Sequence, residues 1–368
     1  MDIAIIIKRF VTTGGAERFA VEVARQLEGR GHRLTVYARE ADPGLLGAAG
    51  FRPVAQRLSF SSVANSWAFA RDVAPLVAAG GHDLVWTHER GYLQDVATVH
   101  TFSYRRSTHA VGPVKRLADW YASPRSWLHL HLEARQMCSF WLAPVSAVIA
   151  EDLTRFYGRR HRMTVITPGV DVSGFDAAGA AQRPHGGDAP GNGERRGLSV
   201  LFIGTEFRRK GLDLLLPAIG REMRLTVVGK GERWRWFRRR VHRLGIGDRV
   251  HFAGLAADVR PFLHDADVLV LPSRAEAFGM SLLEAMAGGL PVVASPSCGA
   301  AALIRHGVNG FLAADTREIR AALDLLRDPG RRRQVGAAAR QTAQSHTWRH
   351  TADAYEALFE RVVAAKRR

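Results

Sequence analysis

The chain has 368 residues, of which 46% are hydrophobic and 24% charged, an ordinary globular composition with enough length for two domains. Lysine and arginine outnumber the acidic residues by 52 to 35, and this net charge of +17 favours a polyanionic partner: nucleic acid, an anionic membrane surface or a phosphorylated substrate. The two cysteines, Cys138 and Cys298, lie far apart without metal-binding spacing, which argues against a disulfide framework and for a reducing compartment.

No apolar run approaches the roughly 20 residues that span a bilayer. The first residues, MDIAIIIKRF, contain a short apolar run typical of a first strand and not of a signal peptide. The sequence therefore predicts a cytoplasmic protein, which can still lie on a membrane surface.

Strands and helices alternate along the first half of the chain. Short apolar segments predict strands, at 2–8, 33–39, 82–88 and 94–100. An amphipathic helix is predicted at 14–31, with Phe19, Val23 and Leu27 on its apolar face. Strands rich in Val, Ile and Leu that alternate with helices predict a parallel sheet covered by helices on both faces.

A segment with almost no large apolar residues divides the chain. Residues 174–197 are rich in Gly, Ala and Pro, which is typical of a linker or an exposed insertion. The alternation then restarts, with strands predicted at 198–204, 224–231, 249–254, 266–273 and 291–295. We expect an N-terminal domain over 1–173 and a C-terminal domain over 198–349. A last amphipathic helix, at about 350–368, packs either on its own domain or back on the first.

The stretch EAFGMSLLEAMAGGLPVVAS holds two glutamates, Glu276 and Glu284, around a glycine turn. Ser281 is a plausible helix N-cap, and Glu276 lies in the loop after a predicted strand, where ligands bind in open α/β sheets. The backbone amides of Phe278, Gly279 and Met280 offer a seat for phosphate at a helix N-terminus. The carboxylates suit sugar hydroxyls, so amides and acids together suit a nucleotide sugar. For Glu284, a capping box with Ser281 is an equally good interpretation.

Two cations occupy a second strand-to-helix turn, in GTEFRRKGLDLLL. This turn begins at Gly204, and Arg209 and Lys210 follow at the same edge of the predicted sheet as Glu276. Arg and Lys at this edge can hold a diphosphate and neutralise it as it departs. Taken without the glutamates, the pair would be two solvated cations.

In the first domain, TTGGAER places Gly14 and Gly15 where the first strand turns into its helix. The spelling is not GxGxxG, so a dinucleotide fingerprint is not supported, and close backbone approach and tight packing remain equal explanations. His100 ends a predicted strand at the expected ligand edge.

These features, with VH at a strand end, TPGVD before the linker and GxPVVAS after the second glutamate, resemble family 4 of the retaining glycosyltransferases. The resemblance covers nearly the whole chain and implies the GT-B architecture, in which two Rossmann-like domains with parallel sheets face each other across a cleft. Within the family, GTEFRRKG and the segment after His100 are most similar to the bacterial lipopolysaccharide core glucosyltransferases that extend the inner-core heptose.

The resemblance also implies roles. Glu276 would bind hydroxyls of the donor sugar and Glu284 the ribose, while Arg209 and Lys210 would hold the diphosphate. The backbone amides of Phe278, Gly279 and Met280 would contact the donor. At two glycine turns, Gly14, Gly15 and Gly204 would let the backbone come close to it. His100 would lie near the transferred sugar, and transfer would proceed with retention by a front-face route, without a cofactor beyond the nucleotide sugar.

Metal ions are not expected. A literal D-x-D, Asp265-Ala266-Asp267, precedes a strand at the sheet edge opposite the site, so we interpret it as structural. His129 and His131 alternate with leucines and lack a third well-spaced ligand, so local packing is the better explanation.

Basic and aromatic residues are interleaved between Tyr104 and Trp141. An interfacial segment on an anionic leaflet uses such residues, here Arg105, Arg106, Lys115, Arg116, Trp120 and Trp127. A helical pair with an aromatic core and a solvated basic face is equally possible, and the resemblance favours membrane contact. Three further basic clusters, at 238–240, 331–333 and 366–368, are expected to be solvated faces.

The sequence therefore predicts an enzyme that moves a hexose, from UDP-glucose, onto a lipopolysaccharide core or a related anionic glycolipid at the inner face of the plasma membrane. The alternatives are a GT-B epimerase or phosphorylase and a non-catalytic polyanion-binding protein. Specific nucleic-acid binding is not expected, because no RNP, zinc-finger or KH signature occurs.

Overall fold

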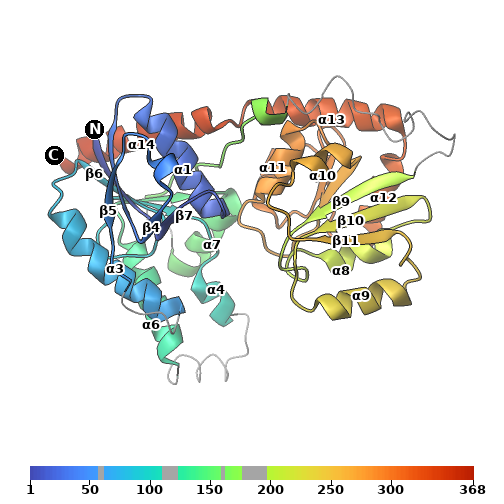
Figure 1. Cartoon of the computed structure of the whole chain (residues 1–368), viewed down its shortest axis with the longest axis horizontal. Helices are drawn as coiled ribbons and strands as arrows, with labels where there is room; N and C mark the ends of the chain where they lie inside the picture. Colours follow the sequence, from blue (N-terminus) through green and yellow to red (C-terminus); the bar gives the residue numbers. More distant parts are fainter. Residues whose placement is uncertain (57–61, 110–122, 159–161, 176–196) are drawn as a thin grey trace. The chain divides into compact units, whose positions relative to one another are not determined.

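The computed structural model describes residues 1–56, 62–109, 123–158, 162–175 and 197–368. It divides the chain into two compact units (Figure 1). The first comprises Met1–Gly169 together with Trp348–Arg368, and the second comprises Val170–Thr347.

The first unit is built on a six-stranded parallel sheet in the order β5-β3-β1-β6-β7-β8. Its strands are β1 (Asp2–Ile6), β3 (Arg33–Ala38), β5 (Gly50–Pro53), β6 (Leu84–Thr87), β7 (Val96–Val99) and β8 (Trp141–Pro144). A short ribbon pairs β2 (Arg9–Phe10) with β4 (Glu40–Ala41). The described helices are α1 (Gly15–Glu28), α2 (Pro43–Leu46), α3 (Ser62–Ala78), α4 (Tyr104–His109), α6 (Pro124–Met137), α7 (Ala147–Tyr157) and α14 (Trp348–Lys366).

Burial follows the predicted pattern. The strands β6 and β7 are buried along their whole length, as expected for strands covered on both faces. The predicted apolar face of α1, with Phe19, Val23 and Leu27, is buried. Order and burial together confirm the predicted α/β class for this unit.

The C-terminal helix α14 belongs to the first unit and runs beside α1 (Figure 1). Tyr355 is fully buried, and its hydroxyl lies 2.7 Å from Oγ1 of Thr98 on β7. In the partly buried periphery of the contact, Arg30 pairs with Glu356 at 2.7 Å. The end of the chain is therefore part of the first unit's core.

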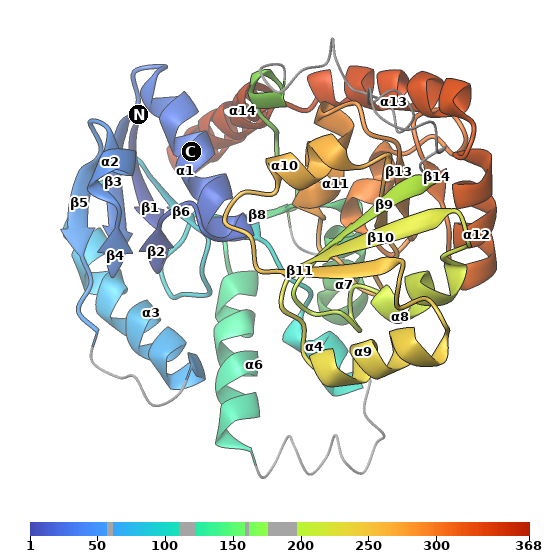
Figure 2. The ribbon, with the colours of Figure 1, turned by 45° about the vertical axis from the view of Figure 1, so that its right-hand side comes forward.

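The second unit repeats the architecture, with a parallel sheet in the order β11-β10-β9-β12-β13-β14. Its strands are β9 (Leu198–Ile203), β10 (Met223–Val228), β11 (Val250–Gly254), β12 (Val268–Leu271), β13 (Val292–Ala294) and β14 (Phe311–Leu312). Its helices are α8 (Leu212–Leu215), α9 (Trp234–Arg243), α10 (Arg260–Asp265), α11 (Met280–Ala287), α12 (Thr316–Leu325) and α13 (Pro329–Gln344), with 3-10 turns η1 (Ser173–Phe175), η2 (Leu216–Ala218) and η3 (Gly299–Leu303). Figure 2 shows β9, β10 and β11 side by side, with α8 and α9 next to them.

In both sheets the strand order reverses next to the first strand, between β1 and β6 and between β9 and β12. Such a reversal opens a crevice beyond the carboxyl ends of the strands, where ligands of doubly wound sheets bind. The topology thus marks one candidate ligand edge in each unit.

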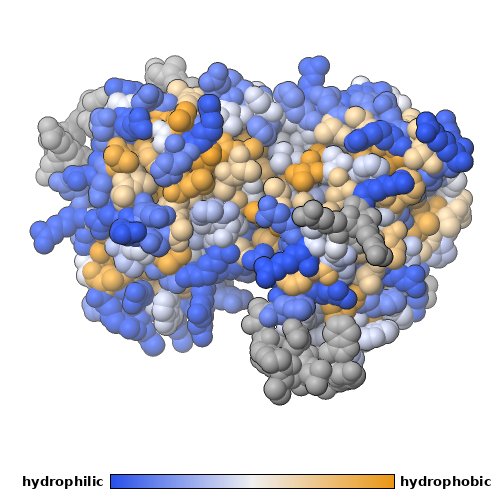
Figure 3. Space-filling view, turned by 180° about the vertical axis from the view of Figure 1, so that it is seen from behind, coloured by the Kyte–Doolittle hydropathy of each residue, from blue (hydrophilic) through white to orange (hydrophobic). Residues whose placement is uncertain are grey.

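Hydrophilic residues dominate the periphery of both units on the face shown in Figure 3, as expected for a chain with this surplus of charge. Within the described residues, no helix combines the length and the apolar character that a bilayer crossing requires.

Candidate active site

Two loops meet at the carboxyl ends of β9 and β12, because these strands are neighbours in the sheet. Gly211 ends the first loop with φ +78, and a Cβ there would lie 2.0 Å from the carbonyl oxygen of Pro272 in the second loop. The amide of Arg274 donates to the carbonyl of Arg209 at 2.8 Å, and the Arg274 guanidinium pairs with Asp213 at 2.8 Å. The loops are therefore held together by backbone contact that only glycine permits and by an ion pair.

This junction brings Glu276 together with both predicted cations. Its Oε2 lies 3.1 Å from Nζ of Lys210 and 3.5 Å from Nη1 of Arg209. The main chain of Glu276 is fixed as well, because its carbonyl accepts from the Gly299 amide at 2.9 Å. Among the described residues, no hydrogen bond reaches the other carboxylate oxygen, Oε1. The site therefore contains two cations and a carboxylate of which only one oxygen, Oε2, is engaged by them.

The neighbouring carboxylates keep Arg209 charged. Partial burial opposes the charge on Arg209, but the carboxylates of Glu206 and Glu276 outweigh it and raise its pKa above the usual range. Glu206 holds the guanidinium at 2.8 Å from the exposed side. Beneath the site, burial and then the Glu276 charge raise the pKa of Cys298 to about 12, so this thiol stays protonated.

The helix that follows the second loop begins differently from the prediction. Gly279, with φ +97, is the N-cap of α11, so Ser281 lies inside the helix and the capping-box interpretation of Glu284 is wrong. A Cβ at Gly279 would meet Sγ of Cys298 at 2.9 Å, which explains why the cap is glycine. Glu284 is buried on α11 and is not needed to cap it. The amides of the first turn, including those of Gly279 and Met280, have no carbonyl partner within the helix and remain available to an anion.

The remaining predicted donor residues of this unit lie in the same place. The ring of Phe278 is buried and its carbonyl accepts from the Ala300 amide at 2.7 Å, so only its backbone can serve a ligand. Gly204 follows β9 beneath the side chain of Lys210, and a Cβ there would come within 2.2 Å of Cδ of that lysine. A glycine at this position therefore lets the lysine lie flat across the end of the strand toward Glu276.

In the first unit, Gly14 is the N-cap of α1 and Gly15 its first residue. A Cβ added to Gly15 would meet nothing within 4 Å, so tight internal packing does not explain this glycine. At Gly14 the nearest group is the flexible side chain of Glu17. The geometry therefore favours the other explanation for Gly15, which is close approach of an external group.

His100 follows β7 and faces a second histidine that the sequence did not single out. Nδ1 of His88, which follows β6, lies 2.9 Å from Nε2 of His100, and the rings stack at 5.2 Å. Phe19 of α1 packs edge-on against His100 at 5.2 Å. Burial lowers the pKa of His100 to about 3, and burial followed by His100 lowers that of His88 in the same direction. Both imidazoles are therefore neutral at physiological pH. The position of His88 at the end of a predicted strand, in the dipeptide TH, is the sequence feature that could have identified it.

The basic and aromatic segment is only partly described. Lys115, Arg116 and Trp120 lie outside the described residues. Arg105 donates to the Phe156 carbonyl at 3.0 Å, and Arg106 lies over the ring of Phe102 at 4.0 Å. These two arginines are thus engaged with their own unit.

Trp127, on α6, is 61% exposed and stacks on His131. His129 stacks on Tyr104, and burial lowers its pKa to about 4. Both histidines therefore have the packing role predicted for them, and Trp127 is the exposed aromatic of the described part of this segment.

The D-x-D residues lie at the amino end of β12. Asp267 accepts from the Ser199 amide at 2.9 Å and lies 3.4 Å from the Arg332 guanidinium, while Asp265 contacts His264. Their contacts are thus structural, as predicted. Over the described ranges, no group of three His, Cys, Asp or Glu side chains has a geometry suited to a metal ion.

Comparison with known proteins links these loops to one enzyme class. The family profile described as "Glycosyltransferase Family 4" matches residues 13–173, and the one described as "Glycosyl transferases group 1" matches 197–328. A D-inositol 3-phosphate glycosyltransferase of Thermomonospora curvata is 30% identical over 92% of this chain and 89% of its own length. A GDP-mannose-dependent alpha-(1-6)-phosphatidylinositol monomannoside mannosyltransferase of Mycobacterium tuberculosis is 29% identical over 91% of each chain.

The crystal structure of WaaG, a glycosyltransferase involved in lipopolysaccharide biosynthesis, superposes with a TM-score of 0.77. It covers 97% of this chain and 99% of its own, at 21% sequence identity. This likeness confirms the predicted fold, with two Rossmann-like units in one chain. It carries no information on the substrate.

Proposed function

The chain belongs to the group 1 glycosyltransferases of family 4, and on this premise we propose that it transfers a hexose from UDP-glucose to an anionic glycolipid, with retention and without a metal ion. The observation that carries the proposal is the cluster of Lys210, Arg209 and Glu276 at the strand reversal of the second unit. Lipopolysaccharide core is the acceptor we favour.

In the proposed complex the donor diphosphate lies against the two cations and the first turn of α11. Lys210 and Arg209 turn from Glu276 toward the phosphates, because a diphosphate offers more negative charge than one carboxylate. Glu276 is then free to accept hydrogen bonds from sugar hydroxyls, beginning with Oε1. Glu284 is assigned to the ribose of the nucleotide.

The reaction breaks the bond between the sugar C1 and the phosphate oxygen and forms a bond between C1 and the acceptor oxygen. The acceptor proton leaves with the departing diphosphate, so the two products are the glycoside and UDP. Arg209 and Lys210 stabilise the negative charge that develops on the leaving group, and removal of one such donor typically costs 10²–10³-fold in rate. His100, neutral and held by His88, is assigned to the transferred sugar.

The acceptor assignment is supported by charge and by relatives. A surplus of 17 positive charges attracts a phosphorylated acceptor over a long range. The mycobacterial relative is named for a phosphatidylinositol monomannoside, an anionic glycolipid of the class that we propose here.

The test is calorimetric titration with UDP and UDP-glucose, alongside GDP and GDP-mannose because one relative is named for that donor. In Glu276→Gln, we expect UDP-glucose binding to weaken at least tenfold, while UDP binding holds or tightens because two cations are released. Arg209→Gln should weaken both ligands.

Glu206→Gln is the matched control, since it removes the same charge from the same arginine on its exposed side. It should leave the preference for UDP-glucose over UDP unchanged. If a GDP-sugar binds and UDP-glucose does not, the proposed donor is wrong and the assignment of the site still holds. An unchanged sugar preference in Glu276→Gln would reject the site assignment.

A further inference from the structure

Helix α9, Trp234–Arg243, is the most cationic helix of the second unit, and the proposed transfer reaction gives it no role. Six of its ten residues are Arg or His: Arg235, Arg238, Arg239, Arg240, His242 and Arg243. No acidic residue lies on the helix, and Arg233 precedes it in a left-handed conformation at φ +56. In the part of the chain that the structure describes, none of these arginines forms an ion pair.

Three of the arginines make a single stripe. Arg235, Arg239 and Arg243 follow one another at intervals of four residues, so they lie on one face of the helix, and all three are exposed. Like charges at this spacing destabilise a helix by roughly 0.2–0.5 kcal/mol per pair. A cation in the first turn is also unfavourable to the helix dipole. Folding therefore does not explain the stripe, and an external anion would.

A tryptophan flanks the stripe on either side. Trp234 is 39% exposed and packs edge-on against Phe252 at 5.1 Å, while Trp236 is 41% exposed and packs against Phe237 at 4.8 Å. Each ring is anchored in the unit and leaves part of its surface to the outside. Half-buried tryptophans beside arginines are typical of the boundary between headgroups and acyl chains.

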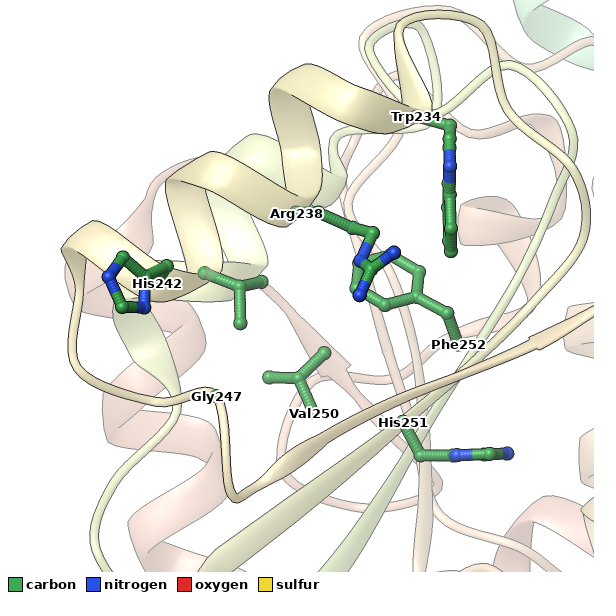
Figure 4. Close-up of a pocket in the computed structure, with 8 residues that line it drawn as sticks. Trp234, Arg238, His242, Gly247, Val250, His251 and Phe252 are labelled. Carbon is green, nitrogen blue, oxygen red and sulfur yellow. The ribbon is translucent and has the colours of Figure 1, made fainter.

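A pocket of about 420 Å³ opens between α9 and the edge strand β11 (Figure 4). Trp234 and Arg238 extend from the helix toward Phe252 on the strand, and the Arg238 guanidinium lies over the Trp234 ring at 5.1 Å. His242 and His251 supply the other polar lining groups. The described residues that line the pocket thus combine N–H donors with an aromatic wall and include no carboxylate.

We propose that α9 and this pocket bind an anionic phospholipid surface, with the arginine stripe against lipid phosphates and one phosphate headgroup in the pocket. The geometry favours a membrane over single-stranded nucleic acid. A base needs an open ring face for stacking, whereas Arg238 covers a face of Trp234 and Phe252 meets that ring too. The inference rests on the second unit alone and does not depend on the proposed function.

The test is sedimentation of the full chain with vesicles of phosphatidylcholine and phosphatidylglycerol, 3:1, and with vesicles of phosphatidylcholine alone. We expect binding to the mixed vesicles only. The variant with Arg235→Gln, Arg239→Gln and Arg243→Gln should lose about tenfold or more in vesicle affinity, because each arginine near an anionic surface contributes separately.

The matched control removes three exposed arginines elsewhere in the second unit, with Arg221→Gln, Arg317→Gln and Arg333→Gln. It lowers the net charge equally and should lose much less affinity. A second variant, Trp234→Ala with Trp236→Ala, keeps the charge and should also weaken binding. Circular dichroism verifies the fold of each variant.

Three results would overturn the proposal: no sedimentation of the native chain, equal losses in the stripe and control variants, or tight binding of a single-stranded RNA oligonucleotide that the stripe variant alone abolishes. The assay contains neither sugar donor nor acceptor. Failure of α9 to bind lipid is therefore distinguishable from failure of the proposed transfer reaction.

Discussion

The pair of His88 and His100 gives the first unit a dependence on pH. Burial lowers the pKa of His100 to about 3, and that of His88 falls in the same direction. In the unfolded chain both side chains titrate near 6.5. Between these values the unfolded state binds protons that the folded state excludes, so the stability present above pH 6.5 is lost as the pH falls.

We expect the free energy of unfolding to drop between pH 7.5 and pH 5.0, and His88→Phe to reduce that drop by about 1–2 kcal/mol. Urea unfolding of the first unit at the two pH values measures it. His251→Gln, at an exposed histidine of the other unit, is the control and should leave the drop unchanged. An equal drop in the native chain and in His88→Phe would show that the pair is not the source.

At the scale of elements, the two loops of the candidate site depend on the close contact between Gly211 and Pro272. Alanine at Gly211 would need a left-handed backbone and would also collide with the Pro272 carbonyl, whose oxygen would lie 2.0 Å from the new Cβ. Gly245 allows the cost of a left-handed backbone to be measured without a collision, since its φ is +65 and a Cβ there meets nothing within 4 Å.

We expect Gly245→Ala to destabilise the second unit by about 1 kcal/mol and Gly211→Ala by about 3 kcal/mol or more. Urea unfolding compares the two variants. Because Gly211 directly follows Arg209 and Lys210, its variant should also weaken UDP binding at temperatures where it stays folded. Equal destabilisation by the two alanines would mean that the loop simply moves aside.

The sequence was sufficient for most strands of the two large sheets and for the central cluster. Short apolar runs predicted β1, β6, β9 and β12, and the position of Glu276 in the loop after a predicted strand led to the sheet edge where the structure places it. The contact of Glu276 with Lys210 follows from the neighbouring positions of β9 and β12, which is a property of the family topology.

Other features depend on contacts between distant segments and could not be predicted. His88 follows a strand, a position that many residues without a functional role also have. Only the pairing of β6 with β7 brings it to His100. Arg274 and Asp213 are 61 residues apart, and their ion pair joins the second loop to α8. Ser281 has the right side chain for an N-cap, but the left-handed Gly279 begins the helix instead.

At the scale of the whole molecule, the first unit is completed by the last residues of the chain. Trp348 and Tyr355 of α14 each pack against Phe19 at 5.8 Å, and Phe19 in turn packs against His100. Losing large buried side chains typically costs 3–5 kcal/mol each, against a total stability of about 5–15 kcal/mol. The second unit has a core of its own.

Removal of Trp348–Arg368 should therefore unfold the first unit and leave the second folded. Hydrogen exchange would show β1 and β6 unprotected, with β9 and β10 still protected. Removal of Arg367 and Arg368 alone is the control and should change neither. Continued protection of β1 in the shorter chain would contradict the assigned role of α14.

The return of α14 to the first unit also fixes an order of events during protein synthesis. The second unit, Val170–Thr347, is fully translated before α14 leaves the ribosome, so it can fold while the first unit is still incomplete. The aromatic support of His100 is assembled last. A prematurely terminated chain would then contain a folded second unit and an unfinished first unit, and protein quality control would recognise the exposed core of the first unit.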